Sequence, residues 1–417
     1  MNRLSERLGS IPAEPIDIWL HTVSVGEFIA AKPIIIKLLA ETDCTILITC
    51  TTVTGSELIS KFIVEQDNNK IKHYYYPYDI TIICRRFLNK TKPKLAIFFE
   101  TEIWPKMYKS LKKRNIRLYL VNARLSEKSY NNYKKIQKYI KTVINSIDYI
   151  GCQSAVDYNY FIKLGYNPKK IDIVGNIKYN LFLPEDLDSK SSEYKKLFTY
   201  NKSQEPIILI AASTHNNEEE IILKIYIKLK LVYPNLILIL APRHPERFGQ
   251  VYNLSFNYGL KTIKYSEFNC SKFFDSDPNF NSSFNSNFNS NFEVYILDII
   301  GQLLYFYNVS DLAFIGGSLV PVGGHNPLEP AALRIPSIIG PNYYNFTDIV
   351  NNLISNNGLL CASSELDLQE KILILLEDVN YRKTIGANAY HCLQEQTDIL
   401  NNYFSLVTSG LTSRSHS

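Results

Sequence analysis

Short apolar stretches alternate with segments of helical character along most of the chain, and this alternation constrains the fold more than any other feature. In the first half, the apolar stretches lie at 16–22, 45–50, 94–99, 117–121 and 149–152. In the second half, they lie at 207–212, 236–241, 312–315 and 337–340. Strands that alternate with helices at this spacing are typical of a parallel sheet with helices on both faces. The sequence therefore predicts an α/β protein with two Rossmann-like, doubly wound sheets.

A polar break between the two sets of strands predicts two domains. With 417 residues, the chain exceeds an ordinary single domain. The segment 185–205 lacks clear apolar periodicity, so we expect it to link an N-terminal domain, 1–184, to a C-terminal domain, 206–395. A C-terminal helix and tail are expected at 396–417. Residues 273–292 repeat phenylalanine, asparagine and serine, which predicts a low-complexity surface insertion.

The charges are unevenly distributed. The net charge is only +5, but residues 85–141 carry seventeen Lys and Arg against three Glu. A basic region of this kind predicts an anionic partner such as nucleic acid, an anionic membrane or a phosphorylated lipid, although a solvated lysine-rich surface is the simpler interpretation. The seven cysteines form no CxxC pair, which argues against disulfides and structural zinc. No apolar run reaches about 18 residues, so no bilayer-spanning segment is expected.

The stretch 311–333 has the clearest local pattern. Its apolar run ends in Gly316 and Gly317, which indicates a buried strand entering a tight turn. Asn326 and Pro327 predict the start of a helix, with Asn326 as the cap and Pro327 at the first helical position. The N–H groups of a glycine-lined strand end that faces a helix N-terminus favour an anion, and we expect phosphate there.

Glu27 has two interpretations. It ends a Ser24-x-x-Glu27 pattern that fits a helix capping box, the more common explanation for such a pattern. Alternatively, Glu27 lies at a strand end beside a glycine and removes a proton from an acceptor hydroxyl. A helix N-terminus is expected to keep its carboxylate ionised near neutral pH, as a base requires.

Further charged residues follow other strands. Glu100 and Glu102 flank one threonine, so in extended geometry their side chains are expected to point the same way. They could stabilise a developing cation or hold sugar hydroxyls; the alternative is a salt bridge to Arg124 or a nearby lysine. Lys178 could pair with an anionic substrate, although a surface lysine is the default interpretation.

In the second half, Arg243 follows a strand and suits bidentate contact with phosphate. His215, His244 and His325 lie on three separate loops without metal-ligand spacing, so we expect no metal site. The chain contains no P-loop motif, no G-x-G-x-x-G fingerprint and no G-x-S-x-G elbow. Polar clusters at the carboxyl ends of many strands are the strongest physical indication of an enzyme.

Seven motifs together carry a resemblance to a known family. They are HTVSVGE (21–27), ETEIWP (100–105), NARLSEKS (122–129), GNIKY (175–179), AASTHNNEEE (211–220), APRHPERF (241–248) and GGSLVPVGGHNPLEPAAL (316–333). In this combination and order, the chain resembles the Kdo transferases, the 3-deoxy-D-manno-octulosonic-acid transferases of lipopolysaccharide synthesis. The resemblance implies a GT-B glycosyltransferase with two Rossmann-like domains facing across a cleft. It also implies an inverting reaction without a metal or cofactor, in which CMP-Kdo is the donor and a lipid A precursor, lipid IVA, is the acceptor.

The resemblance also implies roles for individual residues. Glu27 corresponds to the general base, and Glu100 and Lys178 correspond to groups that assist the transition state. The positions that correspond to the CMP-binding residues are Pro242, Arg243, Ile300, Gly301, Gln302, Asn326, Pro327, Leu328 and Glu329. One of them departs from the family pattern, because Gln302 stands where a glutamate is usual.

The resemblance implies an anionic membrane surface as a partner and no nucleic acid. The hydrophobic anchor that usually opens such chains is not seen, so a peripheral location on the cytoplasmic face of the bacterial inner membrane is expected. Two alternatives remain open at this stage. One is another GT-B protein, such as a transferase with a UDP donor or a nucleotide-sugar epimerase. The other is a non-catalytic protein that binds anionic lipid.

Overall fold

The computed structural model describes residues 3–100, 102–181, 183–199, 204–267, 292–396 and 398–412. The chain divides into two compact units, one formed by residues 1–180 and 396–417 and the other by residues 181–395. The expected insertion at 273–292 lies outside the described residues except for Phe292. Across the described ranges, none of the helices combines the length and the hydrophobicity that a bilayer crossing requires.

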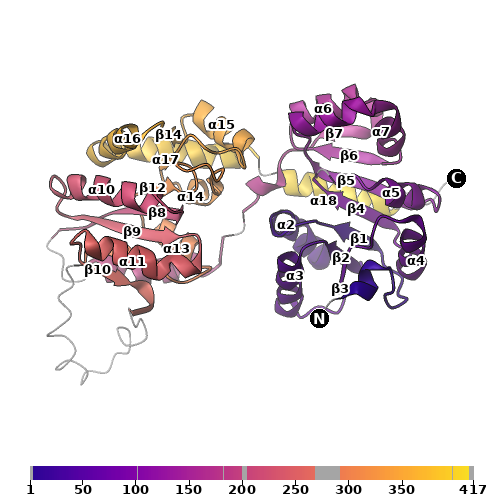
Figure 1. The fold of residues 1–417 in the computed structure, drawn as a ribbon, viewed down its shortest axis with the longest axis horizontal. Coiled ribbons are helices and arrows are strands. Elements are labelled where there is room, and N and C mark those ends of the chain that lie inside the picture. The colour runs from indigo at the N-terminus through magenta and orange to yellow at the C-terminus, as the bar shows by residue number, and fades with distance from the viewer. Residues whose placement is uncertain are drawn as a thin grey trace, which may run out of the picture. The chain divides into compact units, whose positions relative to one another are not determined.

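The first unit contains a parallel seven-stranded sheet in the order β3-β2-β1-β4-β5-β6-β7 (Figure 1). Its strands are β1 (Ile18–His21), β2 (Ile46–Cys50), β3 (Ile71–Tyr75), β4 (Leu95–Phe99), β5 (Arg117–Ala123), β6 (Tyr149–Cys152) and β7 (Ile171–Ile173). Its helices are α1 (Leu4–Arg7), α2 (Val25–Glu41), α3 (Val53–Gln66), α4 (Thr81–Thr91), α5 (Pro105–Lys112), α6 (Glu127–Lys135), α7 (Gln137–Ile144), α8 (Ala155–Lys163) and α18 (Ile399–Thr412).

Alternating side chains along the central strands of this sheet enter two separate cores. Ile18 and Leu20 pack with α2, α3 and α18 on one face, whereas Trp19 packs with α4 and α5 on the other. Because both faces are covered, the central strands are buried along their whole length, as their continuous apolar sequences predict.

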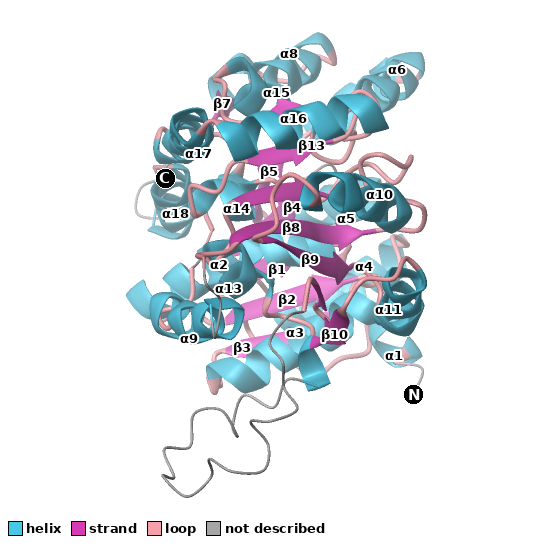
Figure 2. Ribbon diagram, turned by 90° about the vertical axis from the view of Figure 1, so that its left-hand side faces the viewer, coloured by secondary structure: helices cyan, strands magenta, loops and turns pink. Residues whose placement is uncertain are grey.

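The second unit also contains a parallel seven-stranded sheet, in the order β10-β11-β9-β8-β12-β13-β14. Its strands are β8 (Ile207–Thr214), β9 (Leu236–Pro242), β10 (Thr262–Lys264), β11 (Val294–Ile296), β12 (Leu312–Ile315), β13 (Ser337–Ile339) and β14 (Leu360–Cys361). Its helices are α9 (Leu187–Thr199), α10 (Glu218–Lys230), α11 (Phe248–Asn257), α13 (Leu303–Asn308), α14 (Leu328–Ala332), α15 (Thr347–Ser355), α16 (Glu365–Glu377) and α17 (Val379–Gln394). Figure 2 shows the strands lying among the helices that cover them. The predicted α/β class with two doubly wound sheets is confirmed.

The structure places two segments differently from the sequence-based expectation. The expected linker at 185–205 contains α9, which packs against the second sheet through Tyr194 and Phe198. The weak apolar periodicity of this segment is explained by burial of only a few large side chains. The basic segment 130–145, whose sequence predicts a single helix, is divided at Ile136, where φ is −122°, into α6 and α7.

The chain returns to the first unit at its C-terminus. The Tyr403 hydroxyl of α18 donates to the carbonyl oxygen of Gly175 at 2.9 Å and lies 3.3 Å from that of Gly151. Gly175 has a φ of +105°, and a Cβ atom there would lie 2.5 Å from Ile399 Cδ1. Glycine at this position therefore permits both the turn after β7 and the close packing of α18.

Candidate functional site

The strand order of the first unit reverses between β1 and β4, and such a switch point is where ligands bind in sheets of this kind. Glu27 lies in the first turn of α2, directly after β1. Its Oε2 accepts a hydrogen bond from the backbone N–H of Val23 at 2.6 Å, and its Oε1 lies 3.5 Å from Ser24 Oγ. Ser24 caps the helix and accepts from the N–H of Glu27. The capping interpretation is therefore correct in geometry, and it fixes the Glu27 carboxylate at the carboxyl end of the strand.

The protonation of Glu27 differs from the expectation. Burial and, to a smaller extent, the negative charges of Glu100 and Glu102 raise the pKa of Glu27 to about 8, while the hydrogen bond from Val23 opposes the change. The expectation that the helix N-terminus keeps this carboxylate ionised near neutral pH is wrong. Desolvation and two neighbouring carboxylates outweigh the favourable interaction with the helix.

Glu100 and Lys178 form an ion pair with a separation of 3.3 Å between Oε1 and Nζ. Glu100 follows β4 with a φ of +56°, so it is not extended. The expected extended geometry is therefore wrong, although Glu100 and Glu102 both lie close enough to Glu27 to raise its pKa. Lys178 neutralises Glu100, which agrees with the salt-bridge alternative. Burial raises the pKa of Glu102, and the negative charge of Glu100 raises it further.

Asn122 positions the loop that carries Lys178. It is buried at the end of β5 with a φ of +54°, a conformation that asparagine tolerates better than most residues. Its Oδ1 accepts from the N–H of Ile177 at 3.0 Å, and its carbonyl oxygen accepts from Gln153 Nε2 at 2.9 Å. In the sequence, Asn122 stands out only as the first residue of the motif at 122–129. Its positioning role depends on a partner 55 residues away, which no local pattern reveals.

Two buried aromatic side chains beneath this edge were missed by sequence reasoning. The rings of His21 and Tyr76 lie 4.0 Å apart. His21 Nε2 and the Tyr76 hydroxyl are buried without a hydrogen-bond partner among the described residues. Burial lowers the pKa of His21 to about 3, so this imidazole is neutral at physiological pH and is not a cationic ligand.

In the second unit, the strand order reverses between β8 and β12, and the loop after β12 carries the two expected glycines. Its N–H groups are already occupied by Glu218 at the start of α10. Oε2 of Glu218 accepts from Gly317 at 2.7 Å, and Oε1 accepts from Ser318 and Leu319, each at 2.9 Å. The N–H of His215 also donates to Oε2 at 2.9 Å. The expectation that the N–H groups after Gly316 and Gly317 receive a phosphate is therefore wrong, because the protein supplies its own carboxylate.

Three histidines that were expected on separate loops lie together at this edge. His215 Nε2 and His325 Nε2 are 2.8 Å apart, and their rings are nearly parallel, with an interplanar angle of 7°. The ring of His244 lies 5.2 Å from that of His215. Nevertheless, within the described part of the chain, no three His, Cys, Asp or Glu side chains form a group that could hold a metal ion.

The other predicted nucleotide-binding residues occupy the same edge of the second sheet. Arg243 is exposed directly after β9. Asn326 donates from Nδ2 to Glu329 Oε1 at 3.2 Å, and its Oδ1 accepts from the N–H of Leu328 at 3.1 Å. The helix starts at Leu328 with Pro327 as its cap, so it begins one residue later than predicted. Burial raises the pKa of Glu329.

Ile300 and Gly301 lie in the exposed loop after β11. Gln302 begins α13, and its Oε1 accepts a hydrogen bond from the Tyr194 hydroxyl of α9 at 3.1 Å. The segment expected to be a linker therefore contacts one of the residues that correspond to the nucleotide site.

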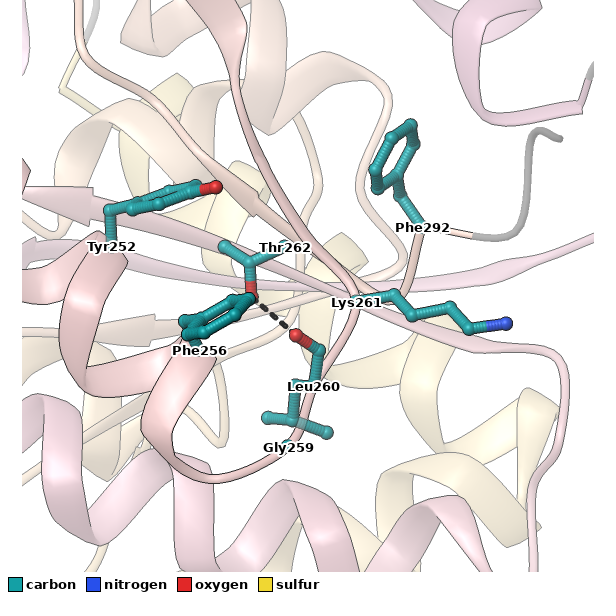
Figure 3. Close-up of a pocket in the computed structure, with 7 residues that line it drawn as sticks. All are labelled: Tyr252, Phe256, Gly259, Leu260, Lys261, Thr262 and Phe292. Carbon is teal, nitrogen blue, oxygen red and sulfur yellow. Dashed lines mark hydrogen bonds between the residues drawn. The ribbon is translucent and has the colours of Figure 1, made fainter. Parts of the chain in front are cut away.

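A separate cavity of about 530 Å³ lies at the opposite, amino end of β10 (Figure 3). It is lined by Tyr252, Phe256, Gly259, Leu260, Lys261, Thr262 and Phe292. The cavity is therefore not part of the polar edge that carries the candidate site.

Comparison with known proteins identifies the family. Residues 2–181 match the family model for 3-deoxy-D-manno-octulosonic-acid transferase. A 3-deoxy-D-manno-octulosonic acid transferase of Haemophilus influenzae is 38% identical, covering 97% of this chain and 90% of the relative. A transferase of the same name from Rickettsia felis is 30% identical, covering 94% of this chain and 79% of the relative.

Solved structures support the fold. A glycosyltransferase from Rickettsia africae is 14% identical, with a TM-score of 0.60, and the match covers 96% of this chain and all of that one. A UDP-GlcNAc 2-epimerase from Neisseria meningitidis is 13% identical, with a TM-score of 0.59, and the match covers 95% of this chain and 99% of that one. With the GT-B fold and the sequence relatives taken together, the chain belongs to the 3-deoxy-D-manno-octulosonic-acid (Kdo) transferase family and is a glycosyltransferase.

Proposed function

We propose that this protein is an inverting transferase that moves Kdo from CMP-Kdo to the lipid A precursor lipid IVA, with Glu27 as the general base. The observation that supports this assignment most directly is the environment of Glu27. A carboxyl group with a pKa of about 8, fixed at the carboxyl end of β1, becomes a base close to physiological pH. An ordinary surface glutamate would be a weaker base.

The proposed reaction is a single displacement. An acceptor hydroxyl oxygen attacks the anomeric carbon of Kdo while the bond between that carbon and the phosphate oxygen breaks. Glu27, in its carboxylate form, receives the hydroxyl proton, and CMP leaves with the bonding electron pair. Attack opposite the leaving group inverts the anomeric centre, so no covalent sugar–enzyme intermediate is needed.

Lys178 and Glu100 are proposed to interact with the Kdo sugar during transfer. The ammonium group of Lys178 is partly exposed, as is the carboxylate of Glu100. Lys178 can therefore approach the carboxylate of Kdo, while Glu100 holds the lysine in place and can stabilise positive charge developing at the anomeric carbon. Both roles depend on the ion pair between Lys178 and Glu100, which is present in the structure.

The second unit is proposed to hold CMP. The residues assigned to this task are Pro242, Arg243, Ile300, Gly301, Gln302, Asn326, Pro327, Leu328 and Glu329. CMP-Kdo carries one phosphate, so the exposed guanidinium of Arg243 can neutralise the leaving group without a metal ion. Because Glu218 fills the loop after β12, the phosphate is expected beside the side chains at this edge instead of on the Gly317 N–H group.

The surface of the first unit supports an anionic membrane as a partner. On α4, Ile82 is 69% exposed and lies one turn before the exposed Arg85 and Arg86. At the junction of α6 and α7, Ile136 is 53% exposed and adjoins the exposed Lys135. Apolar side chains beside cations suit a surface that contacts anionic lipid headgroups and the upper part of their acyl chains.

The function is tested by incubating the protein with lipid IVA and CMP-Kdo generated in situ, followed by mass spectrometry of the lipid. We expect a product that gains Kdo. Glu27→Gln should reduce transfer by roughly 10²–10⁴-fold while CMP still binds. Glu57→Gln, which changes an exposed carboxylate on α3 of the same unit, is the matched control and should retain transfer.

Calorimetry distinguishes the donor classes. Tighter binding of CMP than of UDP supports the proposed donor, whereas tighter binding of UDP indicates a pyrophosphate donor. Full transfer by Glu27→Gln would remove Glu27 from the mechanism. Binding of lipid without any transfer would favour a non-catalytic lipid-binding protein.

A further inference from the structure

The histidine pair at the edge of the second sheet has a hydrogen-bonding arrangement that constrains its protons. His215 follows β8, and His325 belongs to the loop before α14, yet their Nε2 atoms are only 2.8 Å apart. At this distance, one nitrogen carries a hydrogen atom and the other accepts it. Two imidazoles that donate to each other, or accept from each other, are excluded.

Addition of one proton changes the charge of the pair and the number of hydrogen-bond donors that it presents to a ligand. In the neutral pair, the imidazole that donates through Nε2 has an unprotonated Nδ1, so only one of the two Nδ1 atoms carries a hydrogen. In the protonated pair, both Nδ1 atoms carry hydrogen, and the pair bears one positive charge. An anion beside the pair therefore gains both a donor and a charge.

The surroundings keep the free pair neutral. Burial and, to a smaller extent, the charges of His215, Arg243 and His244 together lower the pKa of His325 to about 4. Burial also lowers the pKa of His215, as do the charges of His244, Arg247 and Arg243, while Glu219 opposes the change. Glu218 lies on the same helix as Glu219, but its oxygens are occupied by backbone N–H groups. A phosphate beside Arg243 would add negative charge close to the imidazole pair, where the charges that act on His325 all lower its pKa.

The loop after β12 packs closely against the pair of His215 and His325. A Cβ atom at Gly317 would lie 2.9 Å from His325 Cδ2 and 3.1 Å from its Nε2, so even alanine would displace this ring. The Glu218 carboxylate holds the same loop from its other side through the N–H group of Gly317. The pair is consequently held in place at the strand edge that carries Arg243, and it is not formed by two mobile surface side chains.

We propose that His215 and His325 form a proton-linked phosphate site: when the nucleotide phosphate binds beside Arg243, the imidazole pair takes up one proton and donates to the phosphate oxygens. This inference rests on the proposed CMP-Kdo donor and adds two residues to its binding site. In this site, Arg243 and the protonated imidazole pair together neutralise the negative charge of the phosphate. Release of CMP then returns the proton to solvent.

The test is isothermal titration calorimetry of the full-length protein with CMP at about pH 6.5, in buffers with different ionisation enthalpies. The dependence of the binding enthalpy on buffer measures protons taken up per CMP bound. We expect an uptake approaching one proton in the parent protein and a marked decrease in both His325→Gln and His215→Gln. The phosphate of CMP itself titrates near pH 6, and the comparison with the variants cancels this contribution. His391→Gln, an exposed histidine on α17, is the matched control and should behave as the parent.

A second measurement keeps the inference falsifiable if one variant folds poorly. In the parent protein, CMP affinity should fall by up to about tenfold per pH unit between pH 6 and pH 8, for uptake of one proton. Thermal melting identifies which variants are folded. Cytidine, which lacks the phosphate, should bind without proton uptake. Inorganic phosphate should bind with uptake but at least about tenfold more weakly than CMP.

The outcomes separate the two proposals. If CMP binds and both histidine variants take up as many protons as the parent, the inference is overturned and the proposed function stands. Proton uptake with cytidine, or equal affinity for inorganic phosphate and CMP, also overturns the inference. If CMP does not bind to the parent protein, the proposed function itself fails.

Discussion

At the scale of single residues, several side chains serve a structural and a chemical requirement at once. Glu27 accepts a hydrogen bond from the backbone N–H of Val23 at the start of α2, yet the same carboxylate is the proposed base. These requirements are compatible because one oxygen accepts from Val23 while the other lies near Ser24, where its contact is long at 3.5 Å. The second oxygen is therefore the one we expect to face an acceptor hydroxyl.

The pKa of Glu27 leads to a prediction for the pH dependence of transfer. The carboxylate form is the base, so kcat/KM should rise as the pH increases through about 8. Glu102→Gln removes one of the negative charges that raise this pKa, and it should shift the rise to lower pH by a few tenths to about one unit. The measurement is the pH profile of kcat/KM under identical salt conditions. Glu57→Gln is the control, and an unchanged profile for Glu102→Gln would show that Glu102 does not act on Glu27.

A second prediction at this scale concerns Glu218. Glu218→Ala leaves the N–H groups of Gly317, Ser318 and Leu319 without their acceptor, which should destabilise the second unit by about 2–4 kcal/mol. Hydrogen exchange followed by mass spectrometry should show faster exchange of these three amides by at least about tenfold. Glu220→Ala on the same helix should leave their exchange unchanged, because Glu220 pairs with Lys224. Equal protection in Glu218→Ala would contradict the assigned contacts.

At the scale of secondary-structure elements, helices far from a sheet in sequence complete its core. The C-terminal helix α18 covers the same face of the first sheet as α2 and α3. Arg117 at the start of β5 also donates from Nη1 to the carbonyl oxygen of Gly410 at 2.6 Å. The core of the first unit is therefore complete only when the last part of the chain is present.

The docking of α18 can be tested by fluorescence. Both tryptophans of the chain, Trp19 and Trp104, belong to the first unit, so their emission reports on this unit. Tyr403→Phe removes the donor to the Gly175 carbonyl oxygen, and it should destabilise the unit by about 1–2 kcal/mol in urea. Tyr139→Phe, at an exposed position on α7, is the matched control and should leave the unfolding midpoint unchanged. An unaltered midpoint in Tyr403→Phe would show that the hydrogen bond to the Gly175 carbonyl oxygen does not stabilise the first unit.

At the scale of the whole molecule, the uneven charge predicts salt-dependent binding to vesicles that contain anionic lipid. Screening weakens attraction between exposed charges, so binding should decrease between about 0.1 and 0.5 M salt. The triple variant Lys134→Gln/Lys135→Gln/Lys138→Gln should reduce partitioning by roughly 100-fold, since each lysine near a membrane contributes about 1 kcal/mol. Co-sedimentation is the measurement.

The matched control carries the same charge change in the second unit. Lys195→Gln/Lys228→Gln/Lys383→Gln also replaces three exposed lysines. Equal losses in the two triple variants would mean that net charge alone determines binding. A loss confined to the first variant would assign the contact to α6 and α7.

The sequence alone determined the fold class and the edge of each sheet at which polar residues gather. Fully apolar strands separated by helices require a parallel sheet buried on both faces, and the carboxyl ends of parallel strands necessarily meet at one edge. For this reason, the positions of Glu27, Glu100 and Arg243 after their strands could be predicted, whereas β7, the strand before Lys178, was not. Helix α9 could not be predicted from the sequence, because only a few of its side chains enter the core and its apolar periodicity is weak.

Only the tertiary structure decided how those residues are protonated and paired. Glu218 and Gly317 are 99 residues apart, and His215 and His325 are 110 residues apart. Local patterns identify a glycine-lined turn or a capping box, but they do not show which distant carboxylate fills the turn or how deeply a carboxyl group is desolvated. Hydrogen bonds and pKa values depend on distances and burial that exist only after the strands have assembled. The protonation and pairing of the site residues are therefore determined by tertiary packing.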